Sequence, residues 1–286
     1  MSELATKTKR SPLDYKSDLK PVWCAGCGAY GALTSLYRAL AEIDVPPEDL
    51  VIVSGIGCTS RLPGFVKAYG FHTVHGRALP IATGVKTANP ALTVLAVGGD
   101  GDGLAIGGGH FPHAARRNVD ITYIMLDNSV YGQTKGQSSP TSFPDAQTKS
   151  TPYGPVESAL NPMAMSLAYD ASFVAQGYVG NAQQLTDIIQ RAIRHKGFSF
   201  VHVLSPCVTF NDSYKYLQSR IMDIPEGHDV HDKVKAFQLA LIPDKLPTGI
   251  FYEDDRPIFE EKLEEVRHKA KERGKASLEA LFDKFA

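Results

Sequence analysis

The chain has 286 residues, of which 43% are hydrophobic and 21% charged, a composition typical of a globular protein that buries a substantial core. Its 30 Lys and Arg residues nearly balance its 31 Asp and Glu residues, so neither nucleic acid nor a membrane surface is expected as a partner. No apolar run approaches the roughly 18 residues of a membrane span, and there is no secretory signal, so a cytoplasmic location is expected. Four cysteines are too few for a disulfide scaffold.

Apolar strands alternate with helical patterns along most of the chain. Strands are expected at 50–53, 92–97, 121–126, 172–175 and 198–204, and helices at 29–43, 78–88, 103–117 and 182–196. Because the strands are apolar throughout, they predict an α/β fold with a parallel sheet covered by helices on both faces. The loops that follow these strands then meet at the carboxyl edge of the sheet, where such folds bind ligands.

Composition divides the chain into three regions. Residues 1–20 are expected to form an N-terminal tail, and residues 21–207 carry all the chemical motifs. Residues 208–286 are expected to be a C-terminal extension, irregular to about residue 258 and then an amphipathic helix that packs or binds a partner. Within the central region, residues 128–157 are rich in Gly, Ser, Thr and Pro, and a loop of this length usually serves a function.

Two acidic or amide side chains follow strands that are expected to be neighbours. Asp100 lies in the sequence GGDGDG after one strand, and Asn128 follows the next, with 26 residues between Gly101 and Asn128. Their oxygens are ligands that Mg²⁺ prefers, and the glycines let backbone N–H groups approach phosphates. The spacing resembles the thiamine-diphosphate-binding motif, GDG followed by Asn. A simple turn is the alternative, and Asp102 is a competing ligand that lies farther from the strand.

The cysteines allow three interpretations. Cys24 and Cys27 form a CxxC, whereas Cys58 and Cys207 follow strands at the expected ligand-binding edge. A thioredoxin-like motif would use only the first two, and zinc held by four thiolates usually takes two close CxxC pairs. A [4Fe–4S] cluster accepts four thiolates from distant loops. The neighbouring thiamine motif favours the cluster, because an electron carrier beside thiamine has a chemical role.

Several motifs in order resemble one family over roughly residues 20–210. They are WCAGCG at 23–28, SGIGCTSRLP at 54–63, TVHGRALP at 73–80, GGDGDG at 98–103 and the segment from 126 to 137 that ends in TKGQ. Together they resemble the β subunit of a two-subunit 2-oxoacid:ferredoxin oxidoreductase of the 2-oxoglutarate synthase kind. One departure is Ala25, where the family usually has proline, and this changes loop stiffness rather than ligation.

The resemblance implies a set of cofactor ligands. One [4Fe–4S] cluster would be held by Cys24, Cys27, Cys58 and Cys207, and Mg²⁺ by Asp100, Asn128 and the backbone carbonyl of Val130. Thiamine diphosphate would contact Ile56, Gly57, Cys58, Thr59, His75, Gly101, Asp102, Gly132 and Gln133.

Two residues are candidates for catalytic roles. His75 lies in the HGR loop after a short strand, although a histidine in a turn could simply bond to backbone. Lys135 lies two residues after Gln133, and its ammonium group could pair with a substrate carboxylate. The alternative for Lys135 is a solvated surface lysine.

The implied reaction is oxidative decarboxylation of a 2-oxoacid to an acyl-coenzyme A and CO₂ with reduction of ferredoxin, or the reverse carboxylation. We expect 2-oxoglutarate as the substrate because Lys135 could hold its distal carboxylate, with pyruvate or a branched-chain 2-oxoacid as alternatives. Only the diphosphate-side domain is present, so a partner α subunit should carry the pyrimidine-side domain in a heterodimer or a dimer of heterodimers. The same motifs also fit a non-redox thiamine decarboxylase subunit with a zinc site, or a non-catalytic thiamine-binding subunit.

Overall fold

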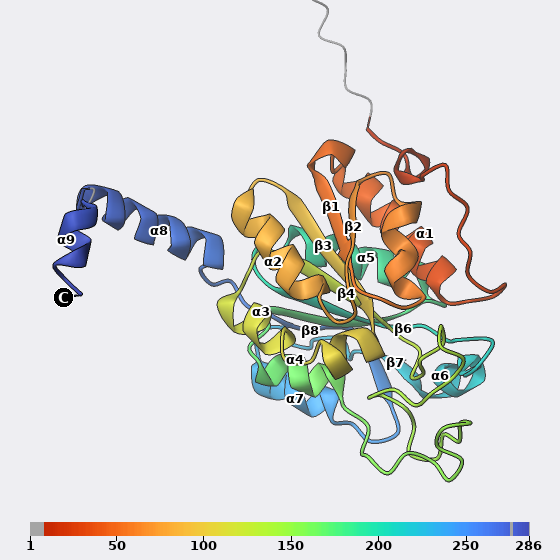
Figure 1. The fold of residues 1–286 in the computed structure, drawn as a ribbon. Helices are drawn as coiled ribbons and strands as arrows, with labels where there is room; N and C mark the ends of the chain where they lie inside the picture. Colours follow the sequence, from red (N-terminus) through yellow and green to blue (C-terminus); the bar gives the residue numbers. More distant parts are fainter. Residues whose placement is uncertain (1–8, 275–276, 286) are drawn as a thin grey trace, which may run out of the picture.

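A computed structural model of the chain describes residues 9–274 and 277–285. In this part of the chain, eight strands form one sheet with the order β2-β1-β3-β4-β6-β5-β8-β7 (Figure 1). The strands are β1 (Leu50–Ser54), β2 (Tyr69–His72), β3 (Thr93–Gly99), β4 (Thr122–Asp127), β5 (Phe173–Tyr178), β6 (Ser199–Leu204), β7 (Ile221–Asp223) and β8 (Leu246–Glu253). All pairs from β2 to β5 in this order are parallel, which confirms the predicted sheet, and β8 adds to β5 in the antiparallel direction.

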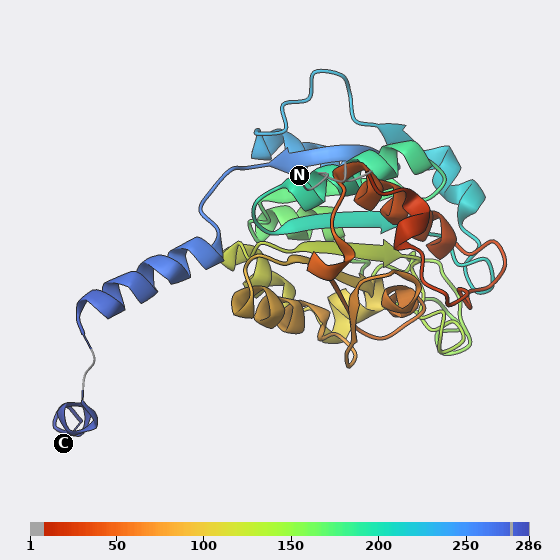
Figure 2. The same ribbon diagram turned by 90° about the horizontal axis from the view of Figure 1, so that it is seen from above.

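Helices cover both faces of the sheet, as predicted. They are α1 (Ala29–Ile43), α2 (Ala78–Ala88), α3 (Phe111–Arg117), α4 (Pro162–Ala168), α5 (Ala182–Arg194), α6 (Tyr214–Arg220), α7 (Lys233–Ala240), α8 (Phe259–Glu272) and α9 (Leu278–Phe282). Short turns of 3₁₀-helix are η1 (Pro12–Tyr15), η2 (Pro47–Asp49) and η3 (Thr59–Phe65), and η4 (Gly101–Ile106) is a turn of π-helix. Helices α1 and α5 pack on one face and α2, α3, α4 and α7 on the other, whereas Figure 2 shows the C-terminal helices extending away from the sheet.

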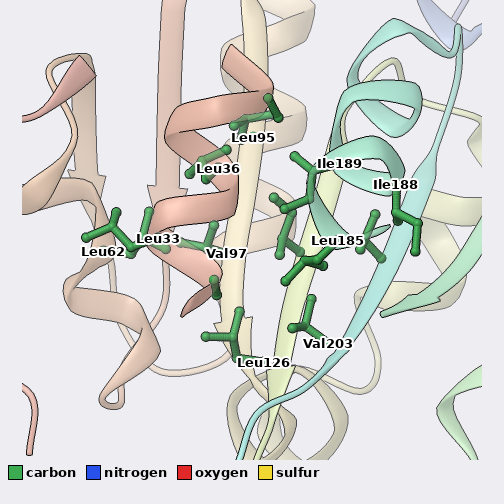
Figure 3. Packing of buried hydrophobic residues seen from close by; sticks show 14 of the residues in the cluster. Leu33, Leu36, Leu62, Leu95, Val97, Leu126, Leu185, Ile188, Ile189 and Val203 are labelled. Atoms are coloured by element: carbon green, nitrogen blue, oxygen red, sulfur yellow. The ribbon is translucent and has the colours of Figure 1, made fainter. Parts of the chain in front are cut away.

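The central strands divide their side chains between two hydrophobic cores. On β3, Leu95 and Val97 face one core, whereas Val94 and Ala96 face the other, because successive strand residues point to opposite faces. The first core packs against α1 and α5 (Figure 3), and the second packs against α2, α3, α4 and α7. The continuous apolar strands in the sequence are therefore explained by burial on both faces.

The predicted helix over 103–117 is wrong, because the chain is broken in the middle of that range. The π-helical turn η4 comes first, and α3 begins only at Phe111. The glycine run between them explains the break. A Cβ atom on Gly107 would lie 2.4 Å from the carbonyl oxygen of Asp102, so the turn requires glycine there. Glycine is also a poor residue for a helix interior.

The predicted irregular character of residues 208–258 is also wrong. This range contains α6, β7, α7 and β8, and Phe251 of β8 is fully buried in the core of the sheet. Pro247 and Gly249 explain the error, because both residues normally argue against a strand. They are tolerated here because β8 is an added antiparallel strand with a register shift where it meets β5 at Val174 and Ala175.

The N-terminal segment is docked against the body over its described part, in contrast to the expected tail at 1–20. Residues 1–8 lie outside the described residues. From Pro12 the chain forms η1, and Tyr15 is fully buried, with its hydroxyl donating to the carbonyl of Val45 at 2.7 Å. Lys67 N–H also donates to the carbonyl of Tyr15 at 2.8 Å. The buried ring of Tyr15 and these two hydrogen bonds therefore hold this segment against the body.

The C-terminal helices leave the body of the molecule. Figures 1 and 2 show α8 running away from the sheet, with α9 beyond it. Val266, Leu278, Phe282 and Phe285 are all more than half exposed. Within the described chain, only the first turn of α8 packs on the body, through Phe259 and the buried Glu260, and a partner-binding role for the exposed remainder stays a prediction. Among the described residues, no helix combines the length and the apolar character that crossing a membrane requires.

Candidate active site

The loops that follow β1, β2, β3 and β4 enclose a cavity of about 280 Å³ at the carboxyl edge of the sheet. We call it the cofactor cavity. Its walls include every residue expected to contact thiamine diphosphate and every expected magnesium ligand, together with Gly99, Tyr131 and Thr134. The parallel sheet thus brings together side chains from four separate loops, as its strand order requires. Their roles as ligands stay predictions.

Asp102 holds two of these loops together. Its Oδ1 atom accepts hydrogen bonds from the backbone N–H of Ile56 at 2.9 Å and of Gly76 at 2.7 Å. The same oxygen lies 2.9 Å from Nδ1 of His75, which is buried but not aligned for a hydrogen bond. Since the carboxylate already accepts from the protein backbone, this arrangement favours Asp100 over Asp102 as the metal ligand.

Asp100 belongs to a buried pair of carboxyl groups. Oγ1 of Thr141 lies 2.9 Å from Oδ2 of Asp100 and 2.7 Å from Oδ1 of Asp127, and its single proton can be donated to only one of them. Burial and the negative charge of Asp127 raise the pKa of Asp100 to about 7. When Asp100 is protonated it can donate to Thr141, and Thr141 can then donate to Asp127.

The hydrogen bond with His202 favours the ionised form of Asp127. Burial alone would raise its pKa, but the hydrogen bond with His202 at 2.9 Å helps to lower the pKa below the ordinary value. Nδ1 of His202 lies 2.7 Å from Oε1 of Gln176, whose amide N–H donates to the carbonyl of Pro247 at 2.8 Å. Both ring nitrogens of His202 therefore face side-chain oxygens. This series of hydrogen bonds connects Asp100, through Thr141, Asp127, His202 and Gln176, to Pro247 of β8.

The turn after β4 presents the other two expected metal ligands. Oδ1 of Asp127 accepts from the backbone N–H of Ser129 at 2.8 Å, and Ser129 takes the left-handed conformation with φ of 55°. The side-chain oxygen of Asn128 accepts from the N–H of Val130 at 3.1 Å, and the carbonyl of Val130 accepts from Gly132. Each of these oxygens has a second lone pair, so ligation of a metal is compatible with this turn.

Close packing fixes the glycine-rich turn on the opposite wall. A Cβ atom on Gly101 would lie 2.2 Å from the ring of Tyr131, and the hydroxyl of Tyr131 donates to the carbonyl of Gly101 at 3.4 Å. Gly76 has φ of 71°, and a Cβ there would meet the backbone of Gly107 at 2.5 Å. These glycines are therefore required by close approach of backbone and ring, which is the kind of cradle that a diphosphate needs.

A second cavity, of about 210 Å³, is lined by all four cysteines. We call it the cluster cavity. Its cysteines come from three loops distant in sequence, and hydrogen bonds tie these loops together. Nε1 of Trp23 donates to the carbonyl of Cys58 at 2.7 Å, and the N–H of Gly28 donates to the carbonyl of Pro206 at 3.2 Å. The hydroxyl of Tyr214 donates to the carbonyl of Gly26 at 3.0 Å.

The thiols of this cavity influence one another. Burial raises the pKa of Cys27 and of Cys58, and the nearby Cys24 and Cys207 raise both further. Four thiolates gathered here would repel each other, so a cationic centre is needed to hold them in the ionised form. In the described part of the chain, no three His, Cys, Asp or Glu side chains are grouped as ligands of a single metal ion.

The two cavities share a wall. Cys58, Asn128, Gly132 and Gln133 line both of them. A Cβ atom on Gly132 would lie 3.4 Å from Sγ of Cys207, so this glycine of the cofactor cavity lies close to a cysteine of the second cavity. The two cavities are therefore immediate neighbours.

The predicted substrate residue Lys135 lies outside both cavity linings. It is exposed and has a left-handed backbone with φ of 79°, next to Thr134, which does line the cofactor cavity. Arg61, absent from the sequence prediction, lines the cluster cavity and an adjoining cavity of about 440 Å³ that also contains Lys20, Ile56 and Gln133. The structure thus supplies a second cation near the cofactor cavity.

Other contributors were missed by the sequence. Asp127, Thr141 and His202 form the polar chain behind the metal site and line a further cavity of about 460 Å³, which also borders Asn128. A signal existed for His202, because a histidine inside an otherwise apolar strand must find partners when buried. Nothing in the sequence pointed to Thr141, which reaches the site from the long loop.

Comparisons with known proteins agree with this geometry. Residues 55–203 match the family described as thiamine pyrophosphate enzyme, C-terminal TPP binding domain. Residues 207–268 match the family described as the C terminal of the pyruvate ferredoxin oxidoreductase beta subunit. The chain therefore contains a thiamine-diphosphate-binding domain followed by a segment typical of ferredoxin-linked β subunits.

Relatives of nearly full length were also found. Subunit beta of 2-oxoacid:ferredoxin oxidoreductase 2 from Aeropyrum pernix is 43% identical over 90% of this chain and 88% of its own length. Subunit KorB of 2-oxoglutarate synthase from Methanocaldococcus jannaschii is 36% identical over 88% of this chain and 95% of its own length.

A solved structure has the same fold. It is the 2-oxoglutarate:ferredoxin oxidoreductase from Magnetococcus marinus with 2-oxoglutarate, coenzyme A and succinyl-CoA bound, which superposes with a TM-score of 0.91 over 93% of each chain at 43% identity. The fold, the thiamine-binding domain and the near-complete relatives agree. The chain belongs to the β subunits of the thiamine-diphosphate-dependent 2-oxoacid:ferredoxin oxidoreductases.

Proposed function

We propose that this β subunit, with a partner α subunit, catalyses the oxidative decarboxylation of 2-oxoglutarate with coenzyme A to succinyl-coenzyme A and CO₂, and passes the two electrons to ferredoxin. The observation that carries the proposal is the wall shared by the cofactor cavity and the four-cysteine cavity. The substrate is supported by the relative named 2-oxoglutarate synthase and by the similar structure described with 2-oxoglutarate and coenzyme A. The reverse carboxylation would use the same site.

Thiamine diphosphate supplies the carbon nucleophile and the electron sink for decarboxylation when it is bound. The buried Oδ2 of Asp102 and Nδ1 of His75 have no hydrogen-bond partner among the described residues, so the cavity offers polar atoms that a ligand can use. Mg²⁺ fits Asp100, Asn128 and the carbonyl of Val130, because all three present oxygen atoms beside the glycine cradle. Residues Gly101 and Gly132 leave room for the diphosphate.

His75 and the cationic residues would act on the reactants. Asp102 holds the His75 loop, so the imidazole can move a proton at the cofactor or substrate within the cofactor cavity. Lys135 is exposed next to a residue of the cofactor cavity, and Arg61 lines the cluster cavity. Either cation can bind a substrate carboxylate. We assign the pyrimidine-side domain to the α subunit, because the described residues form a single sheet that carries the diphosphate-side motifs.

A [4Fe–4S] cluster fits the cluster cavity better than a redox-active CxxC does. All four cysteines line one space, whereas a dithiol motif would use only Cys24 and Cys27. The Trp23 and Tyr214 hydrogen bonds hold the three loops around this space without contributing ligands. Cys24 is exposed, which leaves a route for electrons to an external ferredoxin.

The test begins with metal analysis of the anaerobically purified complex. About four iron and four sulfide per β chain, with an EPR signal after dithionite reduction, are expected. Zinc without sulfide would instead favour the non-redox decarboxylase subunit. Ferredoxin reduction is then measured with 2-oxoglutarate, pyruvate and a branched-chain 2-oxoacid. No preference for 2-oxoglutarate would refute the substrate assignment, and full turnover by the isolated β chain would refute the need for a partner.

A further inference from the structure

One side chain joins the cluster cavity to the metal-binding turn. The side-chain N–H of Asn211 donates to the backbone carbonyl of Asn128 at 2.8 Å. The backbone N–H of Asn211 donates to the carbonyl of Cys207 at 2.9 Å, which closes the turn that carries this cysteine. Asn211 therefore contacts an expected ligand of each site: Cys207, and Asn128 in the shared wall.

The remaining link between the two segments belongs to the sheet. The N–H of Ser205 donates to the carbonyl of Asp127 at 2.8 Å, which continues the pairing of β6 with β4. This bond precedes Cys207 and fixes only the start of the loop. Beyond it, the Asn211 amide donates the hydrogen bond that joins the far end of the Cys207 turn to Asn128, beside the close approach of Gly132 to Cys207.

We propose that Asn211 is a positioning residue that couples occupancy of the cluster cavity to binding of magnesium and thiamine diphosphate. This inference rests on the proposed function. With Cys207 held by the cluster, its turn is fixed, and the Asn211 amide then holds the Asn128 backbone so that the metal-ligating turn keeps its shape. Without the cluster, the Cys207 turn loses an anchor, and the hydrogen bond to Asn128 weakens. Coupling of this kind acts equally in both directions.

The experiment measures affinity rather than turnover. The dissociation constant of thiamine diphosphate in saturating Mg²⁺ is determined by calorimetry on the assembled complex, with the cluster intact and after its oxidative removal with a chelator. We expect cluster removal to weaken binding about three- to tenfold, the effect of losing one amide–carbonyl hydrogen bond. In the Asn211→Ala complex, binding should already be weaker by that factor, and cluster removal should change it less than about twofold.

Two further variants make the test decisive. Asn211→Asp keeps the size of the side chain but places an oxygen against the Asn128 carbonyl, so it should weaken binding at least as much as Asn211→Ala. Asp212→Asn changes the exposed neighbour and should behave as the unaltered complex does. An undiminished effect of cluster removal in both Asn211 variants would overturn the proposal.

The outcomes also separate this inference from the proposed function. An unaltered complex that binds no iron, or no thiamine diphosphate, would contradict the proposed function itself. An unaltered complex that binds both groups, but binds thiamine diphosphate equally well with and without the cluster, would contradict the coupling alone. If cluster removal unfolds the complex, the EPR spectrum of the reduced cluster provides the second measurement. It should change on adding Mg²⁺ and thiamine diphosphate, and change less in Asn211→Asp; equal changes would overturn the proposal.

Discussion

The two cavities that meet at Asn128 are built in different ways. The cofactor cavity is formed by residues that follow adjacent parallel strands, and its buried carboxyl groups are fixed by hydrogen bonds within the protein. The cluster cavity is formed by three loops far apart in sequence, held by a few hydrogen bonds and open at Cys24. The sheet itself shapes the first cavity, whereas the second is shaped by loops that are joined to one another by hydrogen bonds.

The largest effect should follow from removing one cluster ligand. Cys27→Ala should lose most of its iron and lower ferredoxin reduction by about a thousandfold or more, because the remaining thiols cannot hold a four-iron cluster. Thiamine diphosphate affinity should stay within about tenfold of the unaltered complex, since the sheet forms that cavity. Iron analysis and calorimetry check this. Val208→Ala, in the same wall, should keep its iron; a loss there equal to that of Cys27→Ala would contradict the ligand assignment.

Removing the carboxylate that is expected to bind Mg²⁺ should affect the cofactor cavity and leave the cluster cavity unchanged. Asp100→Asn should weaken Mg²⁺-dependent binding of thiamine diphosphate by about a hundredfold while the iron content stays unchanged. Asp102→Asn is the matched control, because its amide oxygen can still accept from Ile56 and Gly76, and about a tenfold loss is expected. Titration at several Mg²⁺ concentrations distinguishes them. A larger loss in Asp102→Asn would assign the metal to Asp102 instead.

Two glycines test how rigid the sheet-built cavity is. Gly101→Ala should lower the free energy of unfolding by about 2 kcal/mol, because the new Cβ would meet the Tyr131 ring. Gly84→Ala in α2 meets no atom within 4 Å and should raise it by up to about 1 kcal/mol, because alanine favours the helix. Denaturant melts of both variants provide the comparison. Equal stabilities would show that the turn adapts and that the cavity is softer than the sheet suggests.

Acid should weaken the metal site but not the four-thiol site in the same range. The raised pKa of Asp100, about 7, means that the metal-binding carboxylate form is lost as pH falls through 7. Mg²⁺-dependent binding should therefore weaken by about fivefold between pH 7 and pH 6, with a proton released on binding. Calorimetry in buffers of different ionisation enthalpy measures that proton. Binding that is independent of pH between 6 and 8 would mean that Asp100 is already ionised.

The smallest effect is expected for Lys135, which is exposed and lines neither cavity. Lys135→Ala should raise KM for 2-oxoglutarate only several-fold, because an exposed ion pair contributes about 1 kcal/mol or less. The KM for pyruvate, which has no distal carboxylate, should not change. Initial rates with both substrates decide this, and an equal rise for both would remove Lys135 from substrate selection.

The sequence predicted what depends on local pattern and on the general rule for parallel sheets. Helices α1 and α2 match the expected ranges 29–43 and 78–88, because apolar spacing and helix ends specify them locally. Asp100 and Asn128 were named from their positions after strands, and the expected thiamine contacts in the cofactor cavity were named from the family resemblance; Gly99, Tyr131 and Thr134 were not named. The roles of the named residues as ligands stay predictions.

What the sequence left out depends on strand order. Gln176 and His202 are register partners on β5 and β6, and Asp127 lies on β4 beside them. Strands β4 and β6 are neighbours in the sheet but not consecutive in the chain, and local periodicity does not reveal that they pair. The hydrogen bonds among Asp127, His202 and Gln176 could therefore not be predicted. Asn211 was missed for a similar reason, because its turn contacts Asn128 across 83 residues of sequence.

Trp23 is the only tryptophan in the chain, and it lies in the wall of the cluster cavity, bonded to the loop of Cys58. Because of this position, the tryptophan fluorescence of the isolated β chain can report on the contents of the cluster cavity. Iron–sulfur clusters absorb broadly across the visible and near-ultraviolet range, so a cluster beside the indole should quench its fluorescence. Cluster assembly, and its loss in air, can then be followed in real time without labels, in a signal that arises at one defined place in the fold.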